Sequence, residues 1–110
     1  MSRTDEYTDN PPSRDEIDAR SGKLVLEFGT AWCGHCQVAQ PHISKVLAAH
    51  PELEHLKIED GPGRRLGRSY RVKLWPTLIF LNHGGEIQRV VRPTDEKVVH
   101  DALQQLISAS

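Results

Sequence analysis

The sequence is poor in several features that would assign a protein to a class. Its longest apolar stretch, residues 78–81, is far too short to span a bilayer. Neither sign of charge dominates, because the net charge is -1 and the pI is about 6.6. We therefore expect no electrostatic binding of nucleic acid or of an anionic membrane surface. The 110 residues, 37% of them hydrophobic, fit one domain with a modest core.

The N-terminal residues MSRTDEYTDNPPSRDEID lack the apolar segment of a secretory signal peptide. We therefore expect the protein to be cytoplasmic, in a reducing compartment where structural disulfides are rare. Cysteine is scarce as well, and the two cysteines, Cys33 and Cys36, are separated by only two residues. In a reducing compartment such a close pair is more often catalytic or metal-binding than structural.

Residues 1–12 are polar and end in two prolines, so we interpret them as a mobile lead-in that carries at most a short edge strand near Tyr7. A folded domain is expected over residues 13–110. It begins with Ser13 and Glu16, which match a capping box and predict a short helix ending near residue 22.

Apolar runs and helical spacing then alternate along the domain. Strands are predicted at residues 23–29, 56–58, 77–81 and 86–91, and helices at residues 37–50, 64–70 and beyond an N-cap at Thr94. A helical crossover should make the first two strands parallel, and a Gly-Gly turn should make the last two an antiparallel hairpin. The fold class is therefore α/β, with a central mixed β-sheet of four to five strands flanked by helices on both faces.

The cysteine pair follows a buried strand and opens a helix. At that position Cys33 meets free backbone N–H groups and the positive end of the helix dipole, which favour the reactive thiolate. Cys36 lies one helical turn later and should be less exposed. We therefore predict that Cys33 attacks a partner disulfide and that Cys36 resolves the mixed disulfide.

Zinc is the competing interpretation of two close cysteines. A structural zinc site needs about four ligands and a catalytic site about three. Only two cysteines are available, and His35 and His42 do not follow a usual ligand spacing. We expect no metal.

At this point the sequence resembles the thioredoxin family. The resemblance covers about residues 13–108 and rests on five features: Leu24–Phe28, the AWCGHC motif of residues 31–36, Pro41 within the next helix, the WPT motif of residues 75–77, and the GGE turn of residues 84–86. It implies a thioredoxin fold and a thiol–disulfide oxidoreductase that exchanges disulfides with protein substrates. It also implies a monomer that needs no cofactor and whose disulfide is reduced again by a reductase or a thiol pool.

The resemblance assigns Trp32, Trp75, Pro76 and Thr77 to substrate binding. Trp32 would be a partly exposed ring that touches partners. A cis Trp75–Pro76 bond would place a loop opposite the cysteines, whose backbone pairs with an extended substrate segment.

The resemblance also makes Glu27 a buried acid behind Cys36. Burial would raise its pKa and let it exchange a proton with Cys36, through water. As an unpaired carboxyl it should cost stability, so Glu27→Gln should if anything stabilise the fold. Many relatives have Lys at the position of His55, and whether His55 pairs with Glu27 is left open. Gly29 replaces a large aromatic and is expected to open one side of the site.

Gly34 and His35 are predicted to tune the redox couple. Gly-His between the cysteines is typical of protein disulfide isomerase domains, and an imidazole near Cys33 stabilises its thiolate and makes the couple more oxidising. A reducing cytoplasm argues for a reductase, so the net direction stays open. Arg92 could select acidic partners. The alternative function is a redox-linked partner-binding or chaperone accessory module with the same fold.

Overall fold

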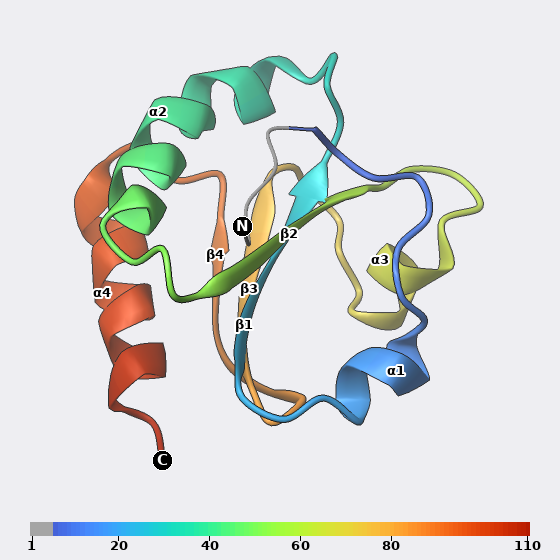
Figure 1. Ribbon diagram of the computed structural model, residues 1–110. Helices are drawn as coiled ribbons and strands as arrows, with labels where there is room; N and C mark the ends of the chain where they lie inside the picture. The colour runs from blue at the N-terminus through green and yellow to red at the C-terminus, as the bar shows by residue number, and fades with distance from the viewer. Residues whose placement is uncertain (1–5) are drawn as a thin grey trace.

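The computed structural model describes residues 6–110 and contains four helices and four strands in these residues (Figure 1). In chain order they are α1 (Arg14–Asp18), β1 (Lys23–Gly29), α2 (Gly34–Ala48), β2 (Glu54–Glu59), α3 (Arg65–Ser69), β3 (Thr77–Asn82), β4 (Gly85–Val91) and α4 (Glu96–Ser108).

The strands form one mixed sheet in the order β2-β1-β3-β4. β1 runs parallel to β2, and the β1–β3 and β3–β4 pairs are antiparallel. This confirms the predicted mixed sheet, with the parallel crossover through α2 and the hairpin of β3 and β4. β1 lies between β2 and β3 and is buried. The turn that carries the cysteines follows directly after this inner strand.

Helices cover both faces of the sheet, as predicted. In Figure 1, α2 and α4 lie on one side of the sheet and α1 and α3 on the other. Because side chains alternate along a strand, β1 serves both cores. Val25 packs with α2 and α4, whereas Leu24, Leu26 and Phe28 pack on the side of α1 and α3.

The helix termini partly follow the predictions. The Ser13–Glu16 capping box is present, but α1 ends at Asp18, before the predicted residue 22. The prediction of Thr94 as the N-cap of α4 was wrong. Asp95 caps this helix, because its carboxylate accepts a hydrogen bond from the Val98 N–H at 3.1 Å.

The lead-in contacts the sheet where it is described. Thr8 forms a parallel bridge with Ile58 of β2, donating its N–H to the Lys57 carbonyl at 2.8 Å and accepting from the Glu59 N–H at 2.9 Å. The edge strand predicted near Tyr7 is thus a single bridge. The part of the lead-in over residues 1–5 lies outside the described residues. No helix between residues 6 and 110 is long and apolar enough to cross a membrane.

Candidate active site

Cys33 is the N-cap residue of α2, at the end of the turn that leaves β1. Its extended backbone, with φ at -78°, directs the sulfur back over the first helical turn. The Cys36 N–H donates to Cys33 Sγ at 3.2 Å, so a backbone donor at the helix N-terminus already faces this sulfur. Both cysteines are free thiols, and Cys36 is the more buried, at 1% exposed against 7% for Cys33.

Cys36 is a poor acid in this site. Burial, and after it the hydrogen bond with Cys33, raise the pKa of its thiol to about 11. A backbone hydrogen bond from Thr30 and a side-chain hydrogen bond with Tyr7 act in the opposite direction. Cys36 must therefore lose its proton to a neighbouring group when it acts as a nucleophile.

Glu27 lies beneath Cys36 on the α2 side of β1. It shares this side with Val25 and Gly29 because the three residues alternate with Leu26 and Phe28 along the strand. The carboxylate is fully buried and has partners on both oxygens. Oε1 lies 2.9 Å from His55 Nε2, and Oε2 accepts from the Tyr7 hydroxyl at 2.8 Å and from Gln40 Nε2 at 2.5 Å.

Two expectations about Glu27 need revision. Burial does push its pKa upward, but the hydrogen bond and charge of His55, the charge of Lys57 and the hydrogen bond from Gln40 outweigh burial and lower the pKa. The predicted rise was therefore wrong, and so was the idea of an unpaired carboxyl. Glu27 is a carboxylate whose charge is stabilised by protein donors, and His55 is one of these partners.

Lys57 completes the ring of groups around Glu27. It is directly opposite Glu27 in the β1–β2 register and is buried. Its ammonium donates to Gln40 Oε1 at 3.1 Å and lies 4.5 Å from the centre of the Tyr7 ring. These contacts hold Gln40 and Tyr7 in place against the carboxylate.

The expectation that Gly29 opens one side of the site was also wrong, because Tyr7 fills that side. A Cβ at residue 29 would lie 2.7 Å from Cys36 Sγ and 2.9 Å from the Tyr7 hydroxyl oxygen. The missing side chain is what allows the tyrosine to approach the thiol. A cavity of about 300 Å³ beside this contact is lined by Tyr7, Cys36, Gln40 and Lys57, among others.

Two tryptophans join the cysteine turn to the proline loop. The rings of Trp32 and Trp75 meet edge to face, with centroids 5.7 Å apart. Trp32 is 75% exposed, whereas Trp75 is half-buried and donates from Nε1 to Asp60 Oδ2 at 2.9 Å. The Trp75–Pro76 peptide bond is cis, as the resemblance implied.

The other predicted site residues occupy two environments. Thr77 is buried, and its hydroxyl donates to the Leu74 carbonyl at 2.6 Å, which braces the proline loop. Gly34 and His35 are exposed in the first turn of α2. Arg92 donates from Nε to the Trp75 carbonyl at 2.9 Å, so its guanidinium supports the loop as well as presenting charge.

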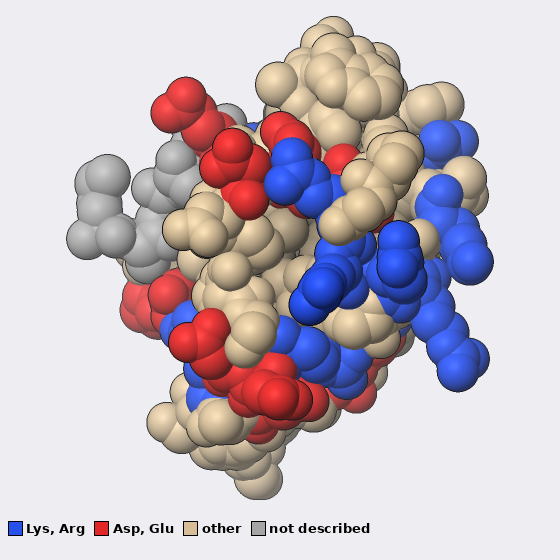
Figure 2. Space-filling view, turned by 90° about the vertical axis from the view of Figure 1, so that its right-hand side faces the viewer, with Lys and Arg blue, Asp and Glu red and all other residues tan. Residues whose placement is uncertain are grey.

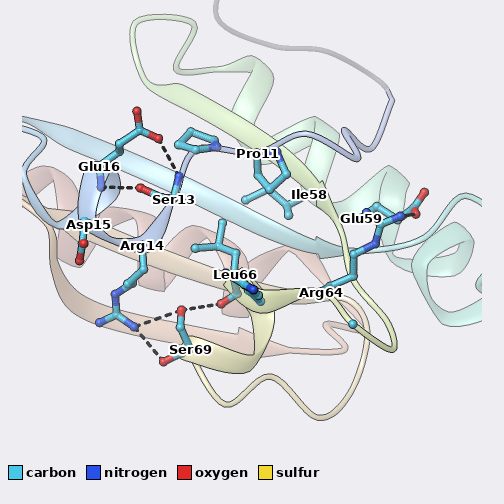
Figure 3. Close-up of a pocket in the computed structure, with 13 residues that line it drawn as sticks. Pro11, Ser13, Arg14, Asp15, Glu16, Ile58, Glu59, Arg64, Leu66 and Ser69 are labelled. Carbon is cyan, nitrogen blue, oxygen red and sulfur yellow. Dashed lines mark hydrogen bonds and ion pairs between the residues drawn. The ribbon is translucent and has the colours of Figure 1, made fainter.

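Two further hollows contain neither cysteine. One, of about 530 Å³, lies between the start of α1 and α3, where Arg14 donates to the Ser69 carbonyl at 2.8 Å (Figure 3). The other, of about 580 Å³, reaches Trp75 and is lined by four cations: Arg64, Arg68, Arg71 and Lys73. Figure 2 shows Lys and Arg side chains gathered on the face that carries α1 and α3. Among the described residues, no cluster of His, Cys, Asp or Glu could hold a metal ion.

Comparison with known proteins agrees with a redox-active pair of cysteines at this site. The sequence model of the thioredoxin family, described as "Thioredoxin", matches residues 8–107. The chain belongs to the thioredoxin family. It is 33% identical over 88 residues to a thioredoxin of Chlamydia trachomatis, covering 80% of this chain and 82% of the relative. It is 30% identical over 81 residues to an H-type thioredoxin of Fagopyrum esculentum, covering 73% of this chain and 70% of the relative.

A solved structure extends the match. The reduced form of thioredoxin 2 from Pseudomonas aeruginosa PAO1 superposes with a TM-score of 0.86 at 52% identity, covering 96% of this chain and 97% of the other. The fold is thus the thioredoxin fold, and the protein is a thiol–disulfide oxidoreductase of the thioredoxin type.

Sequence reasoning missed four residues of this thioredoxin site: Tyr7, Gln40, Lys57 and Asp60. All four act through side chains that meet Glu27 or Trp75 across the fold. The one available signal was Gly29, since an absent side chain beside a redox cysteine leaves a space that another segment can fill.

Proposed function

We propose that the protein exchanges disulfides with protein substrates by a two-step reaction in which Cys33 attacks and Cys36 resolves. The observation that carries the proposal is the hydrogen bond from the Cys36 N–H to Cys33 Sγ at the N-terminus of α2. A donor aimed at a sulfur stabilises the thiolate over the thiol, and the thiolate is the nucleophile.

The two steps move one electron pair each. Cys33 Sγ bonds to one sulfur of the partner disulfide, and the partner's other sulfur leaves as a thiolate. Cys36 Sγ then bonds to Cys33 Sγ and displaces the second partner sulfur. The partner is reduced to a dithiol while the Cys33–Cys36 pair becomes a disulfide, which a reductase or a thiol pool reduces again. In the reverse direction the same couple oxidises a partner.

Glu27 serves the second step as the acceptor of the Cys36 proton. With a thiol pKa of about 11, Cys36 is protonated near neutral pH and needs a base to attack. Glu27 is the ionised carboxylate on the Cys36 side of β1; its lowered pKa keeps it ionised and able to accept a proton, and makes it a weak base that holds the proton only briefly.

Substrates bind at Trp32 and Trp75 and along the backbone of the loop that carries the buried Pro76 and Thr77. The Trp32–Trp75 contact supports this assignment because it holds the cysteine turn and the proline loop together. An extended partner segment pairs with the loop backbone. The four cations around the hollow beside Trp75 favour partners with acidic segments.

His35 shifts the redox couple toward oxidation. We also propose that the protein is a cytoplasmic monomer that uses no cofactor.

The experiment that tests the two-step reaction is trapping by Cys36→Ser. This variant should accumulate mixed disulfides with insulin, whose disulfides are intact, or with lysate proteins, because no second thiol remains to resolve them. Cys33→Ser is the matched control and should trap none. The wild type should also reduce insulin disulfides in the presence of dithiothreitol. A protein that binds partners but neither traps nor reduces them would instead be the redox-linked binding or chaperone accessory module.

A further inference from the structure

The Tyr7 hydroxyl lies between the two groups that must exchange a proton. It donates to Glu27 Oε2 at 2.8 Å. A Cβ on Gly29 would lie 2.9 Å from the hydroxyl oxygen and 2.7 Å from Cys36 Sγ, so the two groups flank the same small space, and hydrogen bonding by Tyr7 lowers the pKa of the Cys36 thiol. One hydroxyl therefore lies beside the thiol and donates to the carboxylate.

This position is built by three parts of the chain. Gly29 leaves the space, since any Cβ there would collide with both the thiol and the tyrosine. The Thr8–Ile58 bridge ties the segment next to Tyr7 to the edge of the sheet. The Lys57 ammonium lies over the tyrosine ring at 4.5 Å, and Gln40 Nε2 lies 3.4 Å from the hydroxyl. These contacts fix the position of the Tyr7 side chain from several sides, which a loosely packed surface tyrosine would not show.

We propose that Tyr7 is a catalytic residue of the resolving step, its hydroxyl relaying the Cys36 proton to Glu27. The inference rests on the function proposed above and adds a residue that precedes the first helix. It replaces the water otherwise needed between the acid and the thiol.

The relay balances without any further reactant. As Cys36 Sγ forms its bond to Cys33 Sγ, its proton passes to the Tyr7 oxygen while the Tyr7 proton passes to Glu27 Oε2. The electron pair of the broken Cys33–partner bond leaves on the partner sulfur as a thiolate. The tyrosine is a phenol before and after the step, and Glu27 then releases the proton to solvent or to the leaving thiolate.

The protonation state of Tyr7 suits this role. Burial raises the pKa of the phenol far above its usual value, and the negative charge of Glu27 raises it further. Tyr7 therefore keeps its proton at every working pH. A hydroxyl that donates and accepts at the same time can pass a proton along but cannot act as a base itself.

The test is the reaction of the reduced protein with a small amount of the aromatic disulfide 5,5′-dithiobis(2-nitrobenzoate). The first thionitrobenzoate released reports attack by Cys33, and the second reports resolution by Cys36. Tyr7→Phe removes only the hydroxyl and keeps the ring that packs under Lys57. We expect the second release to slow by about 100-fold, at the lower end of general acid–base contributions, while the first changes by less than about twofold.

Tyr70→Phe is the matched control. Tyr70 is the second tyrosine of the chain, is buried where Tyr7 is half-buried, and packs against Phe28 on the other face of the sheet. We expect this variant to release both thionitrobenzoates at wild-type rates. An unchanged circular dichroism spectrum and melting temperature for both variants would establish that the fold is kept.

Two further readouts separate proton relay from simple packing. The second release in the wild type should show a solvent deuterium isotope effect that Tyr7→Phe changes. In a Glu27→Gln background, Tyr7→Phe should slow the second release little further, because the acceptor of the relay is already gone. A Tyr7→Phe protein with wild-type resolution, or fully additive slowing in the double variant, would overturn the proposal. Failure of the first release in the wild type would instead contradict the assignment of Cys33 as the nucleophile.

Discussion

His55 and Glu27 meet in the interior of the sheet, with Nε2 2.9 Å from Oε1 and with both side chains buried. The other carboxylate oxygen has Tyr7 and Gln40 as donors. Protein donors therefore replace the water that a carboxylate loses on burial, and these hydrogen bonds offset the free-energy cost of burying the charge. This arrangement makes Glu27 part of what holds β1, β2, α2 and the N-terminal segment together.

Glu27→Gln should lower the free energy of unfolding by about 1–3 kcal/mol at pH 7, because an amide N–H would then face donors that need an acceptor. The pKa of Glu27 is lowered in the folded state, so this stabilisation exists above the usual carboxyl pKa of 4.5 and is lost as the pH falls through the folded value. Urea unfolding at pH 7 and at about pH 3 measures both effects. Glu52→Gln, at an exposed position, is the control; a more stable Glu27→Gln protein would contradict the account.

The two thiols should differ sharply in alkylation. A limiting amount of iodoacetamide at pH 7 should label Cys33, because the Cys36 thiol is buried and its pKa is raised to about 11. In a Cys33→Ser variant, the labelling rate of Cys36 should keep rising above pH 9.0, the ordinary pKa of a thiol, because burial still raises the pKa of Cys36. Peptide mass spectrometry identifies the labelled residue. Preferential labelling of Cys36 in the wild type would reverse the assigned roles.

His35→Pro should make the couple more reducing by tens of millivolts. Proline offers neither a hydrogen bond nor a positive charge to the Cys33 thiolate, and a change of about 30 mV corresponds to about 1.4 kcal/mol for two electrons. The second residue of α2 tolerates proline, since N–H groups in the first turn have no intrahelical acceptor. Equilibration against glutathione buffers measures the potential, and His35→Ala separates loss of the imidazole from the effect of the proline ring. An equal or higher potential in both variants would remove His35 from redox tuning.

Gly67→Ala should disturb the tryptophan loop from a distance. A Cβ at residue 67 would clash with the Asp60 carboxylate, whose Oδ1 would be only 2.1 Å away, and Asp60 is the acceptor for the Trp75 indole N–H. Breaking this hydrogen bond should cost about 1–3 kcal/mol of stability and shift the tryptophan fluorescence. Asp60→Asn, which keeps an acceptor oxygen, should have a smaller effect. Wild-type stability and fluorescence in Gly67→Ala would show that Asp60 does not hold Trp75.

Reversing charge beside Trp75 should weaken reaction with acidic partners. Arg68→Glu with Arg71→Glu should lower the rate of reduction of a disulfide peptide with acidic flanks, with little effect on the same peptide with neutral flanks. The wild-type rate with the acidic peptide should fall as salt is raised, and the double variant should lose this dependence. Equal rates with both peptides in the wild type would exclude charge selection by this hollow.

The sequence predicted what local pattern and spacing determine. Apolar runs located the strands, Ser13 and Glu16 located the start of α1, and the spacing of the cysteines located the redox pair. It could not predict the pKa of Glu27, because the deciding partners come from β2, α2 and the segment before α1. It mistook the N-cap of α4 because Thr94 and Asp95 are both good capping residues, and only the backbone decides which carboxylate or hydroxyl reaches the free N–H.

The close approach above Gly29 ties the fate of two positions that are far apart in the chain. A Cβ at residue 29 would collide with the Tyr7 hydroxyl as well as with Cys36 Sγ, so a substitution there should displace Tyr7 from the thiol. The side chain that covers Cys36 at this point can also be removed, because Tyr7 belongs to the segment before α1, which a protease could cleave off without cutting β1–β4 or α2. Trimming residues 1–12 would leave both cysteines in the protein and yet change how water reaches the resolving thiol. Preparations that have lost Tyr7 should therefore differ in redox kinetics from those that keep it.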